Sequence, residues 1–193
     1  MHQIMILLRK MLEATKYHHV VIKVNKSNLP KTKQDKIEDF LIRAIRSYFS
    51  IDSVLDKEGI FNLLAYNFAT SNLHFLINAT NADEIEEFTT YLHEQYESWI
   101  DREVEFVTYK NYVIDPDMVL DISAHIHTLG AGWERTPHSS LRCYLYDDAP
   151  VWLASQHIKQ IYGNAVDYYE FLKVYKYKEF LIDLKSFATY QTV

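Results

Sequence analysis

The sequence predicts an α+β fold: an antiparallel sheet with helices on one face, followed by a helical C-terminal extension. Three observations predict it. Short stretches rich in β-branched and aromatic residues have the composition of strands, as in Tyr17–Val24. Between them lie stretches with apolar residues at helical spacing. The 193 residues contain only four glycines and four prolines, which excludes collagen-like and proline-rich disordered chains.

The N-terminal half alternates strands and helices. The first helix has Ile37, Leu41 and Tyr48 on one side, and the second begins at Asp83 and carries its apolar stripe to Trp99. A few residues separate the second and third strands, which predicts a hairpin. The expected elements are a strand over 17–24, a helix over 33–49, strands over 60–68 and 73–78, a helix from 83, and a strand over 103–107. This β-α-β-β-α-β order is that of the split-βαβ, ferredoxin-like fold.

In the C-terminal part of the chain, the residue pattern predicts helices and no strands. A third helix is expected over 117–129, and Gly130 and Gly132 end it. Further helical segments follow over 139–144, 151–162 and 166–175. We therefore divide the chain into a sheet domain over 1–130 and a helical extension over 131–193 that packs on it.

Composition limits the classes of partner. The chain has 20 Lys and Arg against 26 Asp and Glu, a net charge of −6. This argues against nonspecific coating of nucleic acid but leaves room for a local basic groove. A single cysteine, Cys143, excludes an internal disulfide and a thiolate zinc cluster. The apolar run Ile4–Leu8 is too short to span a membrane and precedes its charges, unlike a secretory signal. We expect a cytoplasmic protein without a membrane partner.

Five segments, in order, carry a resemblance to a known family. They are Tyr17–Val21, Ala65–Ile77, Thr108–Asn111, His125–Trp133 and Pro137–Leu145. In this order and spacing they resemble the single-tyrosine HUH transposases, especially the REP-associated tyrosine transposases. The last segment, Pro-His-Ser-Ser-Leu-Arg-Cys-Tyr-Leu, is closest to the family's P-W-S-S-Y-R-A-Y-L. The resemblance covers about 17–172 and implies an HUH-type version of the ferredoxin-like sheet.

The resemblance also implies a chemistry. In this family two histidines, one residue apart on a strand, point to the same side of the sheet. Together with a polar ligand from a helix they hold a divalent metal that polarises the scissile phosphate. A tyrosine on that helix attacks the phosphate and forms a 5′-phosphotyrosine link. The substrate is single-stranded DNA beside a hairpin.

Three of the four catalytic positions are altered in this chain. The resemblance assigns the two metal histidines to Asn72 and His74, the nucleophile to His125, and the helix ligand to Leu129. A neutral amide oxygen is a poor replacement for imidazole, and a histidine cannot form a phosphotyrosine. We therefore expect no catalytic residues and no cofactor, with Mg²⁺ or Mn²⁺ required only if cleavage survives.

Two alternatives stay open for the altered site. His74 could form a new metal site with His125 and with His18 or His19, since imidazole is the commonest metal ligand; the competing interpretation makes His74 and His125 structural. Another tyrosine could replace the nucleophile, and the residues nearest in sequence are Tyr109, Tyr112 and Tyr144.

The expected function is therefore recognition of single-stranded or hairpin DNA without cleavage. Basic residues would track phosphates, and aromatic residues would stack on bases. The candidate DNA-binding residues are Lys23, Lys26, Arg43, Arg46, Lys110, Arg135 and Arg142. The alternatives are an active metal-dependent nickase and a protein-interaction module without nucleic acid, which the acidic net charge favours. A homodimer is compatible with the sequence.

Overall fold

The computed structural model describes residues 16–24, 31–34, 36–49, 61–68, 72–100, 109–177 and 188–189. They form a sheet of order β2-β3-β1-β4-β5. The strands are β1 (Lys16–Lys23), β2 (Phe61–Asn67), β3 (Asn72–Ala79), β4 (Tyr109–Ile114) and β5 (Ala188–Thr189). The helices are α2 (Lys31–Gln34), α3 (Ile37–Tyr48), α5 (Ala82–Ile100), α6 (Val119–His127), α7 (Leu141–Leu145), α8 (Gln156–Tyr162) and α9 (Ala165–Tyr177), with 3-10 turns η2 (Pro116–Met118) and η3 (Trp133–Arg135).

Neighbouring strands of the sheet pair antiparallel. β1 lies between β3 and β4, so that Val20 is opposite Phe75 on one side and Asn111 on the other. The pairing of β2 with β3 shifts by one residue between Leu63 and Ala65, which is the mark of a bulge. The predicted α+β class with an antiparallel sheet is confirmed.

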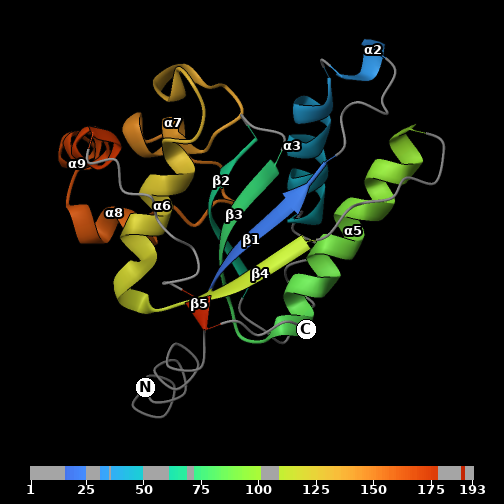
Figure 1. Ribbon diagram of the computed structural model, residues 1–193, viewed down its shortest axis with the longest axis horizontal. Coiled ribbons are helices and arrows are strands. Elements are labelled where there is room, and N and C mark those ends of the chain that lie inside the picture. Colours follow the sequence, from blue (N-terminus) through green and yellow to red (C-terminus); the bar gives the residue numbers. More distant parts are fainter. Residues whose placement is uncertain are drawn as a thin grey trace.

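Helices cover both faces of the sheet (Figure 1). α3 and α5 lie on one face, where the Phe88 ring of α5 packs edge-on against Phe75, with centroids 5.5 Å apart. The helices from α6 to α9 lie on the other face, and α6 contacts β2 and β3. The predicted pair of helices therefore shares one face, while α6 joins the C-terminal helices on the other. Because both faces are covered, β3 is buried along nearly its whole length.

The segment that best matches the transposase pattern covers the edge strand β2. The Phe68 N–H donates to the His138 carbonyl (3.1 Å), and the Ser140 N–H donates to the Tyr66 carbonyl (3.0 Å). Further along, the Ala154 N–H donates to the Leu63 carbonyl (2.9 Å). These bonds satisfy backbone groups that an edge strand would otherwise expose.

Most predicted elements are present with shifted ends. The expected helix over 33–49 is two helices, because the apolar stripe that packs on the sheet begins only at Ile37. The expected helix over 151–162 begins at Gln156, because the preceding residues pair with β2. The expected strand over 103–107 lies outside the described residues, and the fourth observed strand is β4. No described helix is both long and apolar enough to cross a membrane.

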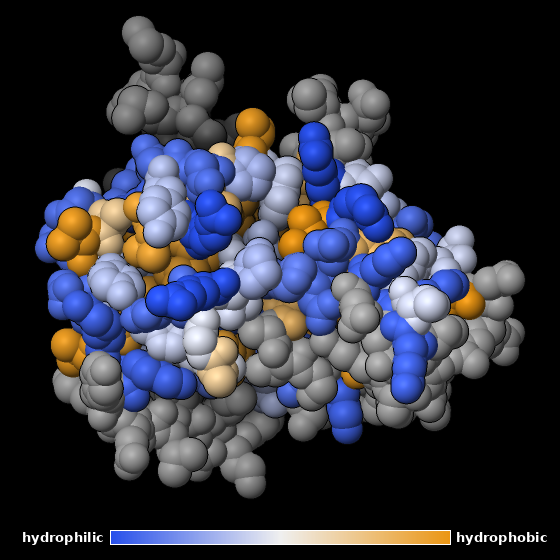
Figure 2. All heavy atoms as spheres, turned by 90° about the horizontal axis from the view of Figure 1, so that it is seen from above, coloured by the Kyte–Doolittle hydropathy of each residue, from blue (hydrophilic) through white to orange (hydrophobic). Residues whose placement is uncertain are grey.

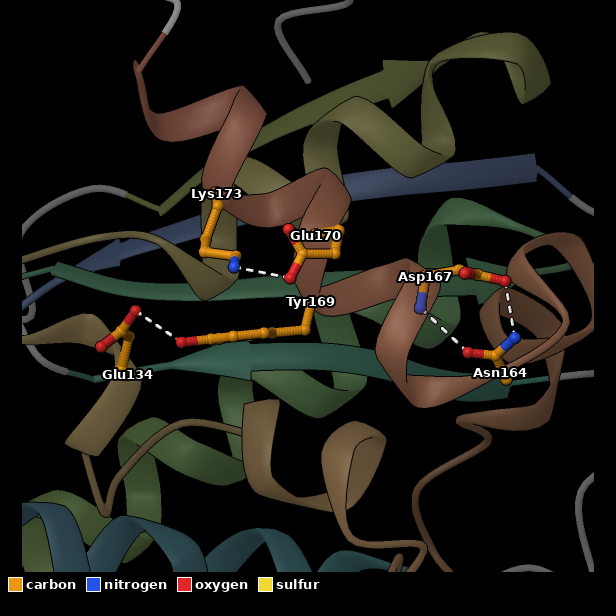
Figure 3. Close-up of polar contacts among 6 residues, drawn as sticks. All are labelled: Glu134, Asn164, Asp167, Tyr169, Glu170 and Lys173. Carbon is orange, nitrogen blue, oxygen red and sulfur yellow. Dashed lines mark hydrogen bonds and ion pairs between the residues drawn. The ribbon is translucent and has the colours of Figure 1, made fainter.

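Side-chain contacts fix the start and the outer side of α9 (Figure 3). Asn164 Oδ1 accepts the Asp167 N–H (2.9 Å), and Asn164 Nδ2 donates to the Asp167 carboxylate (2.5 Å). This reciprocal pair caps the helix. Tyr169 Oη donates to the Glu134 carboxylate of η3 (2.8 Å), which ties α9 to that turn.

Candidate functional site

Three histidines that are far apart in the sequence meet between the sheet and α6. His19 lies on β1, His74 on β3 and His125 on α6. His19 Nε2 and His74 Nδ1 are 3.1 Å apart and share a hydrogen bond. The ring centroid of His125 is 6.0 Å from that of His74 and 6.0 Å from that of His19. We call these three residues the histidine cluster.

Strand register explains which histidines meet. His74 is opposite Val21 in the pairing of β3 with β1, so His19 is its diagonal neighbour on the same face. Side chains alternate along a strand, so His18 belongs to the opposite face. The structure thus brings His74 and His125 together with His19 and not with His18.

The histidine cluster is neutral. Burial lowers the pKa of His19 well below its ordinary value, and repulsion from the other two imidazoles lowers it further. Burial also lowers the pKa of His74 to about 3. The pKa of His125 is lowered by burial and by the nearby Lys176 ammonium. His19 is fully buried, and its Nδ1 has no hydrogen-bond partner.

The structure shows which of the metal-ligand positions implied by the resemblance keep a donor. His19 and His74 turn two ring nitrogens toward each other. Asn72, half-buried at the start of β3, offers a neutral amide, and Leu129, two residues beyond α6, supplies no donor. Within the described ranges, no three His, Cys, Asp or Glu side chains are arranged to hold an ion.

A second buried network surrounds His127, which the sequence did not single out. His127 Nε2 is 2.8 Å from Ser140 Oγ, and His127 Nδ1 is 2.7 Å from Tyr168 Oη. Tyr168 Oη is also 3.1 Å from Ser123 Oγ. The sequence of groups resembles a serine–histidine relay, but Ser140 is completely buried and its Oγ already bonds the backbone of Tyr66. This network joins α6, α7, α9 and β2 and is structural.

The tyrosines considered as replacement nucleophiles differ in their burial and in their neighbours. Tyr144 is buried, and its hydroxyl donates to the Leu64 carbonyl. Burial raises the pKa of this hydroxyl, which removes it from phosphate chemistry. Tyr112 is half-buried on β4, with its ring centroid 6.0 Å from that of His19. The side chain of Tyr109 is outside the described part of the structure.

The candidate DNA-binding residues occupy several places. Lys23 is exposed at the end of β1, paired in register with Asn72. Arg43 and Arg46 are exposed on α3, while Arg135 of η3 and Arg142 of α7 are exposed on the opposite side of the sheet. Seen from above, hydrophilic residues surround smaller hydrophobic patches (Figure 2). Lys26 and the side chain of Lys110 lie outside the described residues.

Neutral imidazoles can donate and accept hydrogen bonds and stack on flat rings, but they supply no positive charge to a phosphate. The exposed Lys23 beside Asn72 is the basic group that the strand register brings to the altered metal position. In the comparisons with known proteins, no family model, curated protein or solved structure matches this chain.

Proposed function

We propose that this chain binds single-stranded or hairpin DNA through an HUH-type, ferredoxin-like fold and does not cleave it. The strand order β2-β3-β1-β4, with α3 and α5 on one face, supports the ferredoxin-like assignment. This arrangement is shared by proteins of unrelated function, so the site has to carry the functional proposal.

The observation that carries the proposal is the contact between His74 and His125. These are the positions that the transposase resemblance assigns to a metal ligand and to the nucleophile. They are 51 residues apart in the sequence, yet their ring centroids are 6.0 Å apart. Two positions that the resemblance requires to be neighbours are therefore neighbours in space.

The same geometry argues against strand cleavage. At the nucleophile position stands an imidazole, which cannot form a phosphotyrosine link. At the first metal position stands Asn72, and the remaining metal position, His74, is hydrogen-bonded to His19. Phosphoryl transfer of this kind needs a cation to neutralise charge on the scissile phosphate, and the neutral imidazoles of the histidine cluster supply no charge of their own.

Affinity in this proposal comes from the exposed basic residues. Lys23 lies beside the altered metal position, and Arg135 and Arg142 extend the contact over the face that carries α6 and α7. Arg43 and Arg46, on the α3 side, would meet DNA only if it wraps around the edge of the sheet. Selectivity for a hairpin would come from its shape.

Binding is expected to weaken steeply with salt and to need no divalent metal. We would measure fluorescence anisotropy of a labelled DNA hairpin with an unpaired tail, between about 50 and 200 mM salt, with EDTA or with Mn²⁺. Replacing Lys23 with Gln should weaken binding roughly threefold to tenfold and reduce the salt slope by about one, as expected for a lost phosphate contact. Lys173→Gln, at a lysine that pairs with Glu170 on the outer side of α9, is the matched control.

A denaturing gel of the same mixtures distinguishes the alternatives. A covalent protein–DNA adduct that a Tyr112→Phe change removes would contradict the inactive interpretation and identify a nickase that uses the tyrosine beside His19. Absence of binding at the lowest salt would contradict DNA recognition altogether and favour the protein-interaction alternative.

A further inference from the structure

A cleft lies where α7, α8 and α9 meet, apart from the histidine cluster. Its volume is about 590 Å³, within the range of small-molecule sites. The lining includes Asp147, Gln156, Lys159, Gln160, Gly163 and Asn164. The proposed DNA contacts do not involve these residues.

The walls of the cleft present amides and little net charge. Gln156 and Gln160 are four residues apart on α8, so both exposed side chains project from one side of the helix. The Lys159 ammonium and the Asp147 carboxylate form an ion pair (2.5 Å) and neutralise each other. Asn164 is held by the α9 cap, which fixes the wall opposite α8 (Figure 3).

Two residues that line the cleft have positive φ angles. Asp147 has a φ of 57°, in the left-handed region that a non-glycine residue seldom adopts, and its carboxylate reaches Lys159. Gly163, between α8 and α9, has a φ of 79°, and a Cβ built there would meet nothing within 4 Å. A flat group can therefore approach the backbone closely at this turn.

An exposed aromatic residue stands next to Asp147 in the chain. Tyr146 is 69% exposed, so its ring is open to a ligand from solvent. The Arg142 guanidinium lies over its ring, 5.8 Å from the centroid. Arginine and tyrosine in this arrangement are typical components of sites that stack nucleobases and hold the adjoining phosphate.

We propose that this cleft receives one unpaired nucleobase, with adenine preferred, from DNA bound as proposed above. Glutamine amides pair with the adjacent donor and acceptor of adenine at N6 and N7. The base would lie between α8 and the turn at Gly163, with Tyr146 and Arg142 contacting the neighbouring nucleotide. A free phosphate fits less well, because Lys159 is already paired with Asp147.

The first test compares hairpins that differ only in an unpaired tail: none, adenines or thymines. In the full chain, the double variant Gln156→Ala, Gln160→Ala is expected to bind the adenine-tailed hairpin about tenfold more weakly and the blunt hairpin unchanged. Gln95→Ala on α5, beyond the sheet, is the matched control and should change neither. Equal affinity of the double variant and the wild type for the adenine tail would overturn the proposal.

A second test is independent of DNA binding. Adenosine monophosphate added to the isotope-labelled full chain should shift backbone NMR signals of α8 and of Gly163, and the shifts should disappear in the double variant. If hairpins do not bind but these shifts occur, the proposed function fails and the base-binding cleft stands. If adenosine monophosphate leaves these signals unchanged, the cleft proposal is wrong even where hairpins bind.

Discussion

Lowering the pH from about 7 to about 5 is expected to reduce the free energy of unfolding by about 4 kcal/mol through two buried histidines alone. His74 and His127 are 7% and 0% exposed, and burial lowers the pKa of each to about 3. In the unfolded chain both would titrate near their ordinary value of about 6.5. Each is therefore neutral in the folded protein over a range where the unfolded chain takes up a proton.

The sign follows from the direction of these shifts. At a pH well above about 6.5 neither state binds the proton, and the contribution of the two histidines to stability is complete. As the pH falls from there toward 3, the unfolded state binds protons and the folded state does not. The free energy of unfolding then decreases by about 1.4 kcal/mol per pH unit for each histidine. His19, whose pKa is also well below its ordinary value, adds to the loss in the same direction. A typical domain has only about 5–15 kcal/mol in total, so this loss is large.

Urea unfolding followed by circular dichroism at several pH values measures the effect. A His74→Gln variant removes one titrating imidazole and should lower the slope of stability against pH by about 1.4 kcal/mol per unit. Gln95→Ala on α5 removes no titrating group and should leave the slope unchanged. Constant stability from about pH 7 to about pH 5 would show that His74 and His127 are not buried as described.

Three strands of the sheet were predictable because the residue composition of a strand is a local property of the sequence. Residues 17–24, 60–68 and 73–78 contain enough β-branched and aromatic side chains to identify β1, β2 and β3. The break between α2 and α3 was not predictable, because it depends on where the stripe meets the sheet. Two-residue β5 carries no pattern that a sequence could reveal.

The histidine cluster was partly predictable for a different reason. Motif order suggested that His74 and His125 belong to one site, and the structure brings them together. The choice of His19 over His18 depends on the register of β1 against β3, which the sequence leaves open by one residue. Burial determines that the three imidazoles are neutral, and the sequence does not contain that information.

The buried network and the cleft were missed because both depend on packing between distant helices. His127 is two residues from His125, whereas its partners Ser140 and Tyr168 lie on segments 13 and 41 residues further on. The closest transposase-like segment, Pro137–Leu145, supplies Ser140 and the strand-covering bonds to β2. That match therefore reports a structural requirement of the fold and carries no information about catalysis.

Replacing Ser140 with Ala is expected to destabilise the protein by about 3 kcal/mol, because it leaves two buried polar groups without partners. Ser140 Oγ accepts the Tyr66 N–H (2.9 Å) and lies 2.8 Å from His127 Nε2. Each unsatisfied group costs about 1–3 kcal/mol. For a chain of this size the melting temperature should fall by roughly 6–12 °C.

Thermal and urea unfolding of Ser140→Ala, His127→Ala and the double variant form a cycle that isolates the contact between the two side chains. Ser140 also bonds the Tyr66 backbone, so the double variant should be less stable than either single one, but by less than the sum of the two effects. A coupling energy above about 0.5 kcal/mol is expected for groups in one network. Ser47→Ala, at an exposed serine of α3, should change stability by less than about 0.5 kcal/mol. Additive effects within that margin would mean that Ser140 and His127 do not share a hydrogen bond.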